Sequence, residues 1–514
     1  MKISFEDGMG IKNDSPQQAT TKTYVNTSEA AGSAAGEADA VDGSMFLNAE
    51  FWKQYALNDL IPYWYKYARD KECGGFYTNM SREWKPLDPW DKYPAMISRQ
   101  VFGFSAAYLL SGDDKYIEAA RDGVDFLLKH AWDMEYGGWF DLLTCEGEPK
   151  DTSKSIPLQL YTNVGLTMYY FTTGNSGVLP YIYKSIDIQK TYGYDSEFNG
   201  YYQSLRRDLS VLDSAKNKHA HYGYVGSLLL NLWLASREAE ALKWECQLTD
   251  LTLEHMVDPD NGWINGYMNS LDRQWRFEPY IKDGIEYIHI GAQLTAALSF
   301  LRLYHQTGKK LYLEQGKALS DRINRYGWDA ERGGWIDMVE KAYPHSPAPF
   351  NMVLNWIQNY GCFLQLQLYR LTNENKYLER YKKSETFWYK HLRDTKHGGV
   401  FTTVSPEGML EDEGRKAAPW RTSYHEMEHA FLNYLYLNTY VGKQPAVLHF
   451  KMDCSDPSMK FFVSPIDDAS VQVIGVRVNG KSWDGFDAHE RSIVLPVGKE
   501  IKVEVTLGSC HPHL

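Results

Sequence analysis

Apolar residues alternate along this chain between two kinds of predicted helix. The first kind is apolar on one face only, as in residues 116–130 and in matching runs that begin at Tyr312 and Tyr377. The second kind is apolar on nearly every side and comprises residues 101–110, 158–171, 222–234, 290–304, 361–369 and 430–440. Because a helix with one polar face lies at a surface and a helix without one is buried, the pattern predicts outer helices around inner helices.

A recurring turn separates the two kinds of helix. Its clearest copy is Asp133-Met-Glu-Tyr-Gly137-Gly138-Trp139, in which an aspartate precedes a glycine pair and an aromatic residue. Further copies, some degenerate, begin at Asp70, Asp195, Asp258, Asp329 and Asp394. A supersecondary unit repeated at near-constant spacing indicates a repeat architecture. An open solenoid has the same periodicity, but six helical hairpins are enough to close a ring, so we predict a mainly α fold, an (α/α)6 barrel.

The barrel is predicted to span residues 46–443. Residues 1–45 contain few bulky apolar side chains and are expected to be disordered. Residues 444–514 contain short β-branched runs and the hairpin signal Asn479-Gly480, which predict a small β-sandwich-like domain. No apolar stretch approaches the roughly 20 residues that cross a bilayer.

Charge and cysteine usage narrow the class of protein. The net charge is −12 and no basic stripe is present, which disfavours nucleic acid or a membrane surface as partner. The six cysteines are scattered without ligand spacing, so we expect reduced thiols rather than disulfides or a zinc site. Without a secretory signal, the expected location is cytoplasmic and the expected state a monomer or homodimer.

Candidate chemistry lies where the predicted inner helices begin, because these ends converge at one mouth of a barrel. The polar and aromatic residues there are Arg99, Asn217, His219, His221, His289, Trp356, Gln358, Trp420, Tyr424, His425 and His429. The chain has only 15 histidines, and several of them fall at equivalent positions of the repeat. Histidine transfers protons near neutral pH, so this placement favours an acid–base site.

These motifs, in this order, resemble those of the N-acylglucosamine 2-epimerase superfamily, which also contains cellobiose 2-epimerases and aldose–ketose isomerases. The matches are Arg99-Gln100-Val101 with Phe104-Ser105, Asn217-Lys-His219-Ala-His221, His289, Trp356-Ile-Gln358 and Trp420-Arg-Thr-Ser-Tyr424-His425. The resemblance covers residues 46–443. It implies a sugar epimerase or isomerase that moves the C2 proton of an open-chain aldose through an enediolate.

The resemblance also implies a role for each matched residue. His289 and His425 would be the acid–base pair, and Arg99 would polarise the sugar carbonyl. Asn217 and His221 would hold sugar oxygens. The substrate site would be completed by Trp356, Gln358, Trp420 and Tyr424. No metal or other cofactor is implied, and the partner is a small sugar.

Two departures from the family pattern alter the expected tuning of the histidines. The family commonly has His-Asp-x-Glu where this chain has His289-Ile-Gly-Ala292, and a glutamate where this chain has Tyr360. Glu286, Glu426 or Glu428 could supply the missing carboxylates.

Three other interpretations remain open at this point. A barrel hydrolase would need acids at the mouth, for which the candidates are Asp88, Asp91, Asp213 and Asp283. The segment from His425 to His429 also fits the zinc-protease pattern His-Glu-x-x-His. A non-catalytic sugar-binding protein would fit the missing carboxylates and the added β domain.

Overall fold

The structure, a computed structural model, describes residues 42–216, 218–222, 224–268, 270–410 and 413–509. Its long helices alternate between an outer and an inner ring. The outer ring comprises α1 (Ala49–Tyr55) with α2 (Ile61–Tyr67), α4 (Asp114–Phe126), α6 (Leu179–Tyr192), α8 (Ala239–His255), α10 (Lys310–Tyr326) and α12 (Asn375–His391). The inner ring comprises α3 (Pro94–Ser111), α5 (Ile156–Thr173), α7 (Tyr224–Ser236), α9 (Ile290–Thr307), α11 (Asn355–Thr372) and α13 (Tyr424–Tyr436).

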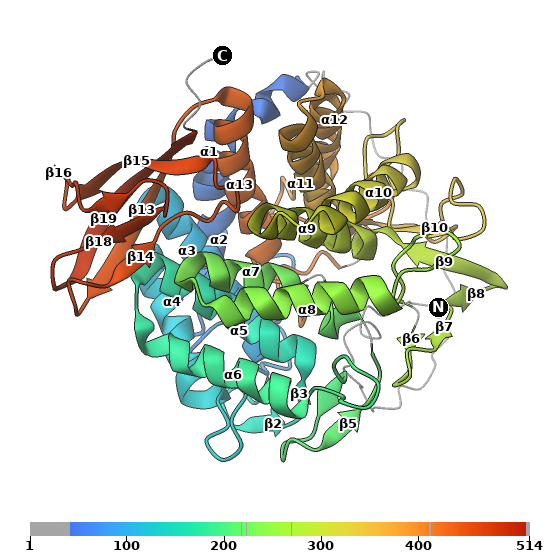
Figure 1. The fold of residues 1–514 in the computed structure, drawn as a ribbon, viewed down its shortest axis with the longest axis horizontal. Helices are drawn as coiled ribbons and strands as arrows, with labels where there is room; N and C mark the ends of the chain where they lie inside the picture. The colour runs from blue at the N-terminus through green and yellow to red at the C-terminus, as the bar shows by residue number, and fades with distance from the viewer. Residues whose placement is uncertain (1–41, 217, 223, 269, 411–412, 510–514) are drawn as a thin grey trace.

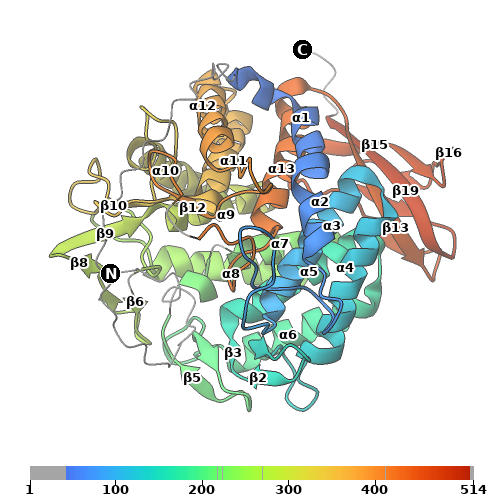
Figure 2. The same cartoon turned by 180° about the vertical axis from the view of Figure 1, so that it is seen from behind.

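The inner helices form a closed ring. Each packs against the next in chain order, and α13 returns to pack against α3. The closure is tight at Gly103 of α3, where an added Cβ would lie 2.1 Å from the Ser423 hydroxyl oxygen. Figure 1 and Figure 2 show the helices from opposite sides, arranged around one centre. The predicted (α/α)6 barrel is confirmed, and the open solenoid is excluded.

Burial explains why the two rings differ in sequence. Helix α3 is buried at every position except its last, because the outer ring covers one side and the other inner helices cover the rest. Helix α4 instead buries one face and exposes the other. The hydrophobic pattern placed the start of α3 at residue 101 because Arg99 and Gln100 interrupt the apolar run, although both side chains are buried.

The recurring turn has the same local structure in several repeats. In its clearest copy the Asp133 carboxylate accepts a 3.0 Å hydrogen bond from the Glu135 amide, and Gly137 and Gly138 adopt φ values of +75° and +79°. Lys154, which is buried, pairs with the same carboxylate at 3.1 Å. The same aspartate–lysine pair recurs as Asp70–Lys92, Asp195–Lys216 and Asp394–Lys416. The turn aspartates are therefore neutralised inside the fold.

Short strands lie at the mouth of the barrel, in the loops that precede the inner helices. They are β1 (Leu142–Leu143), β2 (Pro149–Asp151), β3 (Lys154–Ser155), β4 (Ser204–Leu205), β5 (Val211–Asp213), β6 (Ser270–Leu271), β7 (Phe277–Glu278), β8 (Ile281–Lys282), β9 (Ile285–His289), β10 (Met338–Glu340), β11 (Val353–Leu354) and β12 (Thr403–Val404). Strand β9 pairs with β10 of the next repeat, which places His289 opposite Met338.

The C-terminal region forms two antiparallel sheets, as predicted. One has the order β13 (Ala446–Cys454), β19 (Gly498–Ser509), β15 (Val471–Val478), β16 (Lys481–Ser482), and the other β14 (Lys460–Phe462), β18 (Ser492–Val494), β17 (Phe486–Asp487). Asn479 and Gly480 connect β15 to β16 with positive φ values of 48° and 79°, the conformation expected of this hairpin signal.

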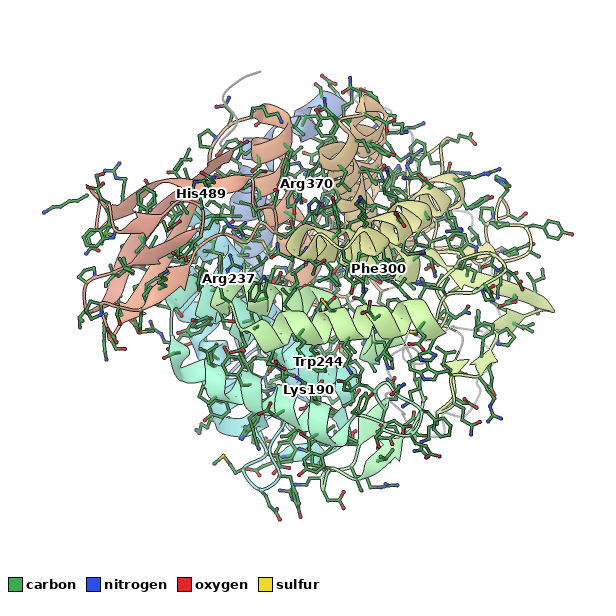
Figure 3. The ribbon with its side chains drawn as sticks, viewed as in Figure 1. Lys190, Arg237, Trp244, Phe300, Arg370 and His489 are labelled. Atoms are coloured by element: carbon green, nitrogen blue, oxygen red, sulfur yellow. A yellow bond between two sulfur atoms is a disulfide. The ribbon has the colours of Figure 1, made fainter. Side chains whose placement is uncertain are left out.

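This β domain covers the end of the barrel opposite the mouth. Strand β13 packs against α3 and α5, and β14 packs against α7. Its loop of residues 464–468 reaches the ends of the inner helices, where Asp467 pairs with Arg370 at 2.9 Å. In Figure 3, Arg370 is labelled among the helices, and the strands of the β domain, with His489, lie to its left. One hydrophobic cluster runs through both parts, so the β domain shares the core of the barrel.

The described chain begins slightly before the predicted barrel boundary. Residues 1–41, for which disorder was predicted, lie outside the described residues. Asp42 caps a 3-10 helix (Gly43–Leu47), and Phe46 is fully buried. Within the described ranges, no helix has both the length and the apolar character needed to cross a membrane.

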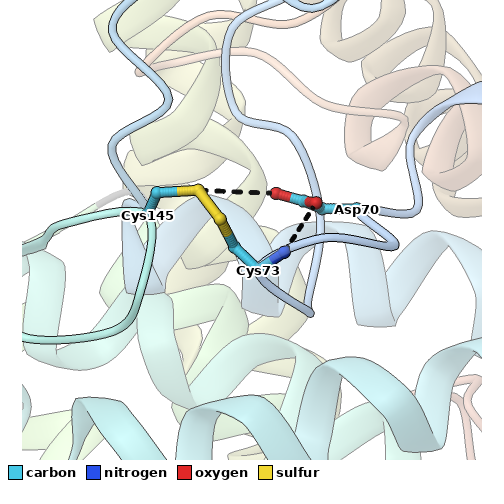
Figure 4. A group of neighbouring side chains, drawn as sticks. All are labelled: Asp70, Cys73 and Cys145. Carbon is cyan, nitrogen blue, oxygen red and sulfur yellow. Dashed lines mark hydrogen bonds between the residues drawn. A yellow bond between two sulfur atoms is a disulfide. The ribbon is translucent and has the colours of Figure 1, made fainter.

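The expectation of reduced cysteines is wrong for one pair. Cys73 and Cys145, 72 residues apart, form a disulfide (Figure 4). Cys73 lies in the turn of the first repeat, and Cys145 in the β1–β2 hairpin of the second. The two meet because the backbone of Lys92 pairs with that of Leu143 and brings the hairpin over the turn.

Asp70 lies beside this disulfide, and with the two cysteines it forms a cluster of potential metal ligands (Figure 4). Its carboxylate is paired with the buried ammonium of Lys92. The two sulfur atoms are bonded to each other, so the cluster as it stands is a covalent staple between two repeats and not a metal centre.

Candidate active site at the mouth of the barrel

Histidines and aromatic rings form a continuous row at the mouth of the barrel. Neighbouring members are in contact, and in order they are Tyr161, Arg99, Tyr424, His425, Trp356, His289, Tyr267 and His219. Trp356 stacks on both central histidines, with ring centroids 5.7 Å from His289 and 6.3 Å from His425. The structure thus brings together both predicted acid–base residues, the predicted arginine and two predicted aromatic residues.

Arg99 is a buried cation without a carboxylate beside it. Only 2% of the residue is exposed, and its guanidinium lies 4.8 Å from the Tyr424 ring centroid. Its Nη1 donates a 3.0 Å hydrogen bond to the carbonyl of Trp420. Within the described part of the chain, Arg99 forms no ion pair, and its Nε and Nη2 groups have no hydrogen-bond acceptor. Such a group can stabilise negative charge that develops on a ligand oxygen.

His425 is largely buried and is held in its neutral form. Burial, and then the positive charge of Arg99, lower the pKa of His425 to about 4. The side chain keeps 13% exposure, which leaves it reachable from the mouth. Its Nδ1 lies 3.7 Å from the Glu428 carboxylate. A neutral imidazole at this position can accept a proton at neutral pH.

His289 begins α9 as its N-cap. Its Nδ1 accepts a 2.9 Å hydrogen bond from the Ala292 amide, which places the proton of the neutral ring on Nε2. Nε2 lies 3.0 Å from Asp337, a carboxylate that the sequence analysis did not identify. The backbone carbonyl of Asp337 also accepts from the Ile290 amide at 2.8 Å. Asp337 therefore supports both the start of α9 and the orientation of the imidazole.

The two histidines of the Asn-x-His-x-His motif, His219 and His221, contact different parts of the structure. Nε2 of His221 accepts a 2.9 Å hydrogen bond from the Tyr201 amide, and its ring packs 4.9 Å from Trp275. His221 thus supports the turn of its own repeat. His219 instead joins the row at the mouth, with its ring 5.5 Å from Tyr267. Of the two motif histidines, His219 therefore lies in the row and His221 outside it.

Gln358 also serves a turn. Its amide oxygen accepts from the Trp335 amide at 2.6 Å, and its nitrogen donates to the Trp335 carbonyl at 2.8 Å. The same two bonds recur between Gln159 and Trp139 and between Gln293 and Ile264. A bond made in three repeats is part of the scaffold, so Gln358 is placed there and not among the substrate contacts.

The remaining predicted residues fall into three situations. Asn217 lies outside the described residues. Tyr424 belongs to the row and donates a 3.0 Å hydrogen bond to Glu428. Trp420 borders the site through its carbonyl oxygen, the acceptor of Arg99.

Of the carboxylates expected to replace the missing family pair, Glu428 alone contacts a row histidine among the described residues. Glu286 pairs with Lys341 and Glu426 with Arg421, each at 2.8 Å. Asp337 supplies the other carboxylate, from the bend that precedes β10 in the next repeat. Glu428 was among the candidates named from the sequence, whereas Asp337 was not, because it does not lie at the start of an inner helix.

The acids and the second histidine of the competing interpretations do not join the row. Asp88, Asp213 and Asp283 are exposed, and Asp91 pairs with Lys150 at 2.6 Å. His429 is buried against Glu385 at 3.1 Å, away from the mouth. His425 and His429 therefore have different partners, and the zinc-protease pattern does not form one site.

A pocket with about 70 Å³ of free space lies directly below the row. Tyr360 and Glu428, which contact His425, line its upper part, and Phe102, Thr167 and Leu298 line its walls. Its far wall includes Pro465 of the β domain. The volume is enough for roughly five water molecules. The β domain thus helps to close the interior beneath the site.

The (α/α)6 barrel together with the comparisons that follow identifies the chain as a carbohydrate epimerase or isomerase. The model of the N-acylglucosamine 2-epimerase (GlcNAc 2-epimerase) family matches residues 74–428, and the chain belongs to this family. The match ends before the β domain.

Individual relatives agree with this assignment. A cellobiose 2-epimerase of Bacteroides fragilis is 24% identical over 71% of this chain and 93% of its own length. A D-mannose isomerase of Marinomonas mediterranea is 22% identical over 76% of this chain and 96% of its own. The structure of a cellobiose 2-epimerase from Bacillus thermoamylovorans superposes with a TM-score of 0.66 at 20% identity, covering 75% of this chain and 98% of that one.

Proposed function

We propose that this protein removes the C2 proton of an open-chain aldose, or of the reducing end of a larger sugar, and returns it to C2 or C1. Return to the opposite face of C2 gives the epimer, and return to C1 gives the ketose. The observation that carries the proposal is that Tyr424 contacts both His425, which is neutral and partly exposed, and Arg99, which forms no ion pair among the described residues. A base and an oxyanion partner are what enediolate formation requires.

In the first step, the lone pair of His425 takes the C2 proton. The electrons of the C–H bond form the C1–C2 double bond, and the carbonyl electrons move to the C1 oxygen. Arg99 stabilises that oxygen through the guanidinium groups that lack a protein acceptor. Trp356, which stacks on both histidines, and Tyr424 provide flat surfaces on which a sugar can pack.

His289 is the second member of the proposed pair, and its geometry sets a condition on its role. Because Nδ1 accepts the Ala292 amide, the ring takes up a second proton only when this cap bond breaks. Asp337, 3.0 Å from Nε2, then offsets the positive charge. The sugar contacts proposed beside this pair are His219, Trp420 and the predicted Asn217.

The test uses cellobiose, D-mannose and a panel of further aldoses and ketoses in D2O, with the relatives' substrates as the first choice. We expect deuterium at C2 or C1 and otherwise unchanged mass. His425→Ala should reduce exchange by roughly 10²–10⁴-fold. His289→Asn should do the same while keeping an N-cap acceptor for α9, which separates proton transfer from capping.

Wild-type exchange rates in both variants would refute the proposal. Retained exchange in His289→Asn alone would leave His425 as the base and reduce His289 to a cap. A product heavier by one water would instead indicate a hydrolase, and binding without any exchange a sugar-binding protein.

Two further proposals concern the state of the protein. The monomer or homodimer stays a prediction for sedimentation analysis. For the location, we propose an oxidising compartment in place of the cytoplasm, because disulfides such as Cys73–Cys145 persist there and are rare in reducing cytosol. Free thiols at both cysteines in protein taken from its native cells under thiol-blocking conditions would refute this.

A further inference from the structure

His425 has a carboxylate partner on its own helix, α13. The family pattern puts a glutamate at the position of Tyr360 on α11, and this chain has no carboxylate there. Glu428 lies instead one turn along α13, with its carboxylate 3.7 Å from Nδ1 of His425. The Tyr360 hydroxyl donates a 3.1 Å hydrogen bond to that same carboxylate. The tyrosine that replaces the family glutamate therefore holds the residue that carries the negative charge.

The Glu428 carboxylate is fixed from two sides. Tyr360 donates to Oε2, the oxygen nearest His425, and Tyr424 donates to Oε1 at 3.0 Å. Only 12% of the Glu428 side chain is exposed. Two tyrosine donors on one carboxylate restrict its rotamer, because each bond is lost if the side chain moves.

We propose that Glu428 is the positioning carboxylate of His425, and that Tyr360 and Tyr424 hold it for this purpose. The carboxylate orients the Nδ1 proton of the neutral ring toward itself, which assigns the lone pair to Nε2. When Nε2 takes the sugar proton, Glu428 offsets the new positive charge. This inference rests on the proposed role of His425 as the base.

The surroundings of His425 explain why such a partner is needed. Burial and the Arg99 guanidinium both oppose a second positive charge there, and Arg421 adds to the opposition from the loop before α13. Glu428 is the acidic group that acts in the other direction. Without it, the imidazolium formed on proton transfer would stand beside a guanidinium in a mostly buried site, and the transition state that leads to it would rise in energy.

Glu428→Gln tests the inference, because it removes the charge with little change in shape. An opposite charge within about 4–6 Å commonly favours the charged form of a group by a factor of roughly ten or more, so we expect kcat to fall roughly 10- to 100-fold when the Glu428 charge, 3.7 Å from Nδ1, is removed. KM should stay within about twofold, since Glu428 acts through His425 and not on the sugar. The double variant Tyr360→Glu with Glu428→Gln returns a carboxylate to His425 from α11, and should recover at least about fivefold in kcat over Glu428→Gln.

Glu385→Gln is the matched control. Glu385, on α12, pairs at 3.1 Å with His429, which lies on the same helix as His425. The substitution is therefore chemically identical to Glu428→Gln, but it lies outside the row. It should lower the melting temperature and leave kcat unchanged. Melting curves of all variants show whether each is folded at the assay temperature.

A Glu428→Gln variant with kcat within twofold of the wild type would overturn the inference. So would a loss that appears wholly in KM, because Glu428 would then bind the sugar itself. If His425→Ala keeps wild-type exchange, the proposed base is wrong and the failure belongs to the proposed function. If His425→Ala is inactive and Glu428→Gln is fully active, only the role of Glu428 fails.

Discussion

Asp467 joins the β domain to the barrel, and replacing it with asparagine should weaken the whole fold. The residue is fully buried. Its carboxylate accepts from Arg370 at 2.9 Å, from Arg302 at 3.3 Å and from the Tyr436 hydroxyl at 3.2 Å. Asparagine keeps one acceptor for Arg370 and Tyr436, but turns an N–H donor toward the Nε–H of Arg302. Both ion pairs lose their negative charge, and at Arg302 one donor faces another donor.

The expected size of the effect follows from the burial of the partners. The Arg370 side chain is 3% exposed and that of Arg302 is 12% exposed, so water cannot replace the lost charge fully. Breaking a buried ion pair by removing one partner typically costs about 3–5 kcal/mol. With an unfolding entropy of about 2.1 cal/mol/K per residue, a chain of 514 residues should lose about 3–5 °C of melting temperature.

The pH dependence of this effect has a defined sign. Burial alone would raise the pKa of Asp467, but Arg370 and Arg302 outweigh it and hold the pKa below its ordinary value of 3.8. A depressed carboxyl pKa contributes stability above the unfolded pKa and loses it as the pH falls through the folded pKa. The difference between variant and wild type should therefore be constant from pH 5 to 8.

Differential scanning calorimetry across pH 5–8 measures this difference, with Asp484→Asn as the control. Asp484 lies in the same domain but is exposed, so the same chemical change there should cost less than about 0.5 kcal/mol. If Asp467→Asn is as stable as Asp484→Asn, the loop of residues 464–468 does not fasten the β domain to the barrel. A difference that grows between pH 5 and 8 would contradict the assigned ionisation.

Two further predictions concern single groups. Peptide mapping without reductant should recover Cys73 linked to Cys145, with Cys246, Cys362 and Cys454 free, and recovery of both peptides unlinked from oxidised protein would contradict this. Because the bond closes a loop of 72 residues, the double variant Cys73→Ser with Cys145→Ser should lose up to about 4 kcal/mol of folding stability. Burial raises the pKa of Glu245 from 4.5 to about 8, so ionising its carboxyl lowers folding stability as the pH rises from 4.5 to 8. Glu245→Gln should therefore stabilise the protein by on the order of 4 kcal/mol at pH 8 and have little effect near pH 4.5. Equal stabilisation at both pH values would refute the assignment.

The fold could be predicted because inner and outer helices bury different fractions of their surface. An inner helix such as α3 is covered on all sides, and its sequence records this as a run without a polar face. The disulfide could not be predicted in the same way. Cys73 and Cys145 meet only because one repeat folds its hairpin over the turn of another, a contact that no local pattern encodes.

The site could be predicted in part, for a related reason. Arg99, His289 and His425 stand at inner-helix starts, which the repeat identifies directly. Asp337 stands in a turn of the next repeat and reaches back to His289. Its backbone carbonyl caps α9, as the carbonyls of Gln203 and Thr402 cap α5 and α11. Aligning the turns would have shown a carboxylate at this capping position beside a histidine.

The repeat also separates scaffold from site, and Gln358 provides the test. A scaffold residue should recur, and the two bonds that Gln358 makes to Trp335 are made by Gln159 to Trp139. Substituting alanine for either glutamine leaves one buried amide and one buried carbonyl without a partner, at about 1–3 kcal/mol each. Gln358→Ala and Gln159→Ala should therefore lower stability by similar amounts, and neither should change KM by more than about twofold below its melting transition. Trp356, two residues earlier on the same helix, stacks on both histidines instead. If Gln358→Ala raises KM tenfold while Gln159→Ala does not, Gln358 contacts the sugar, and recurrence is not a guide to which residues of this barrel bind substrate.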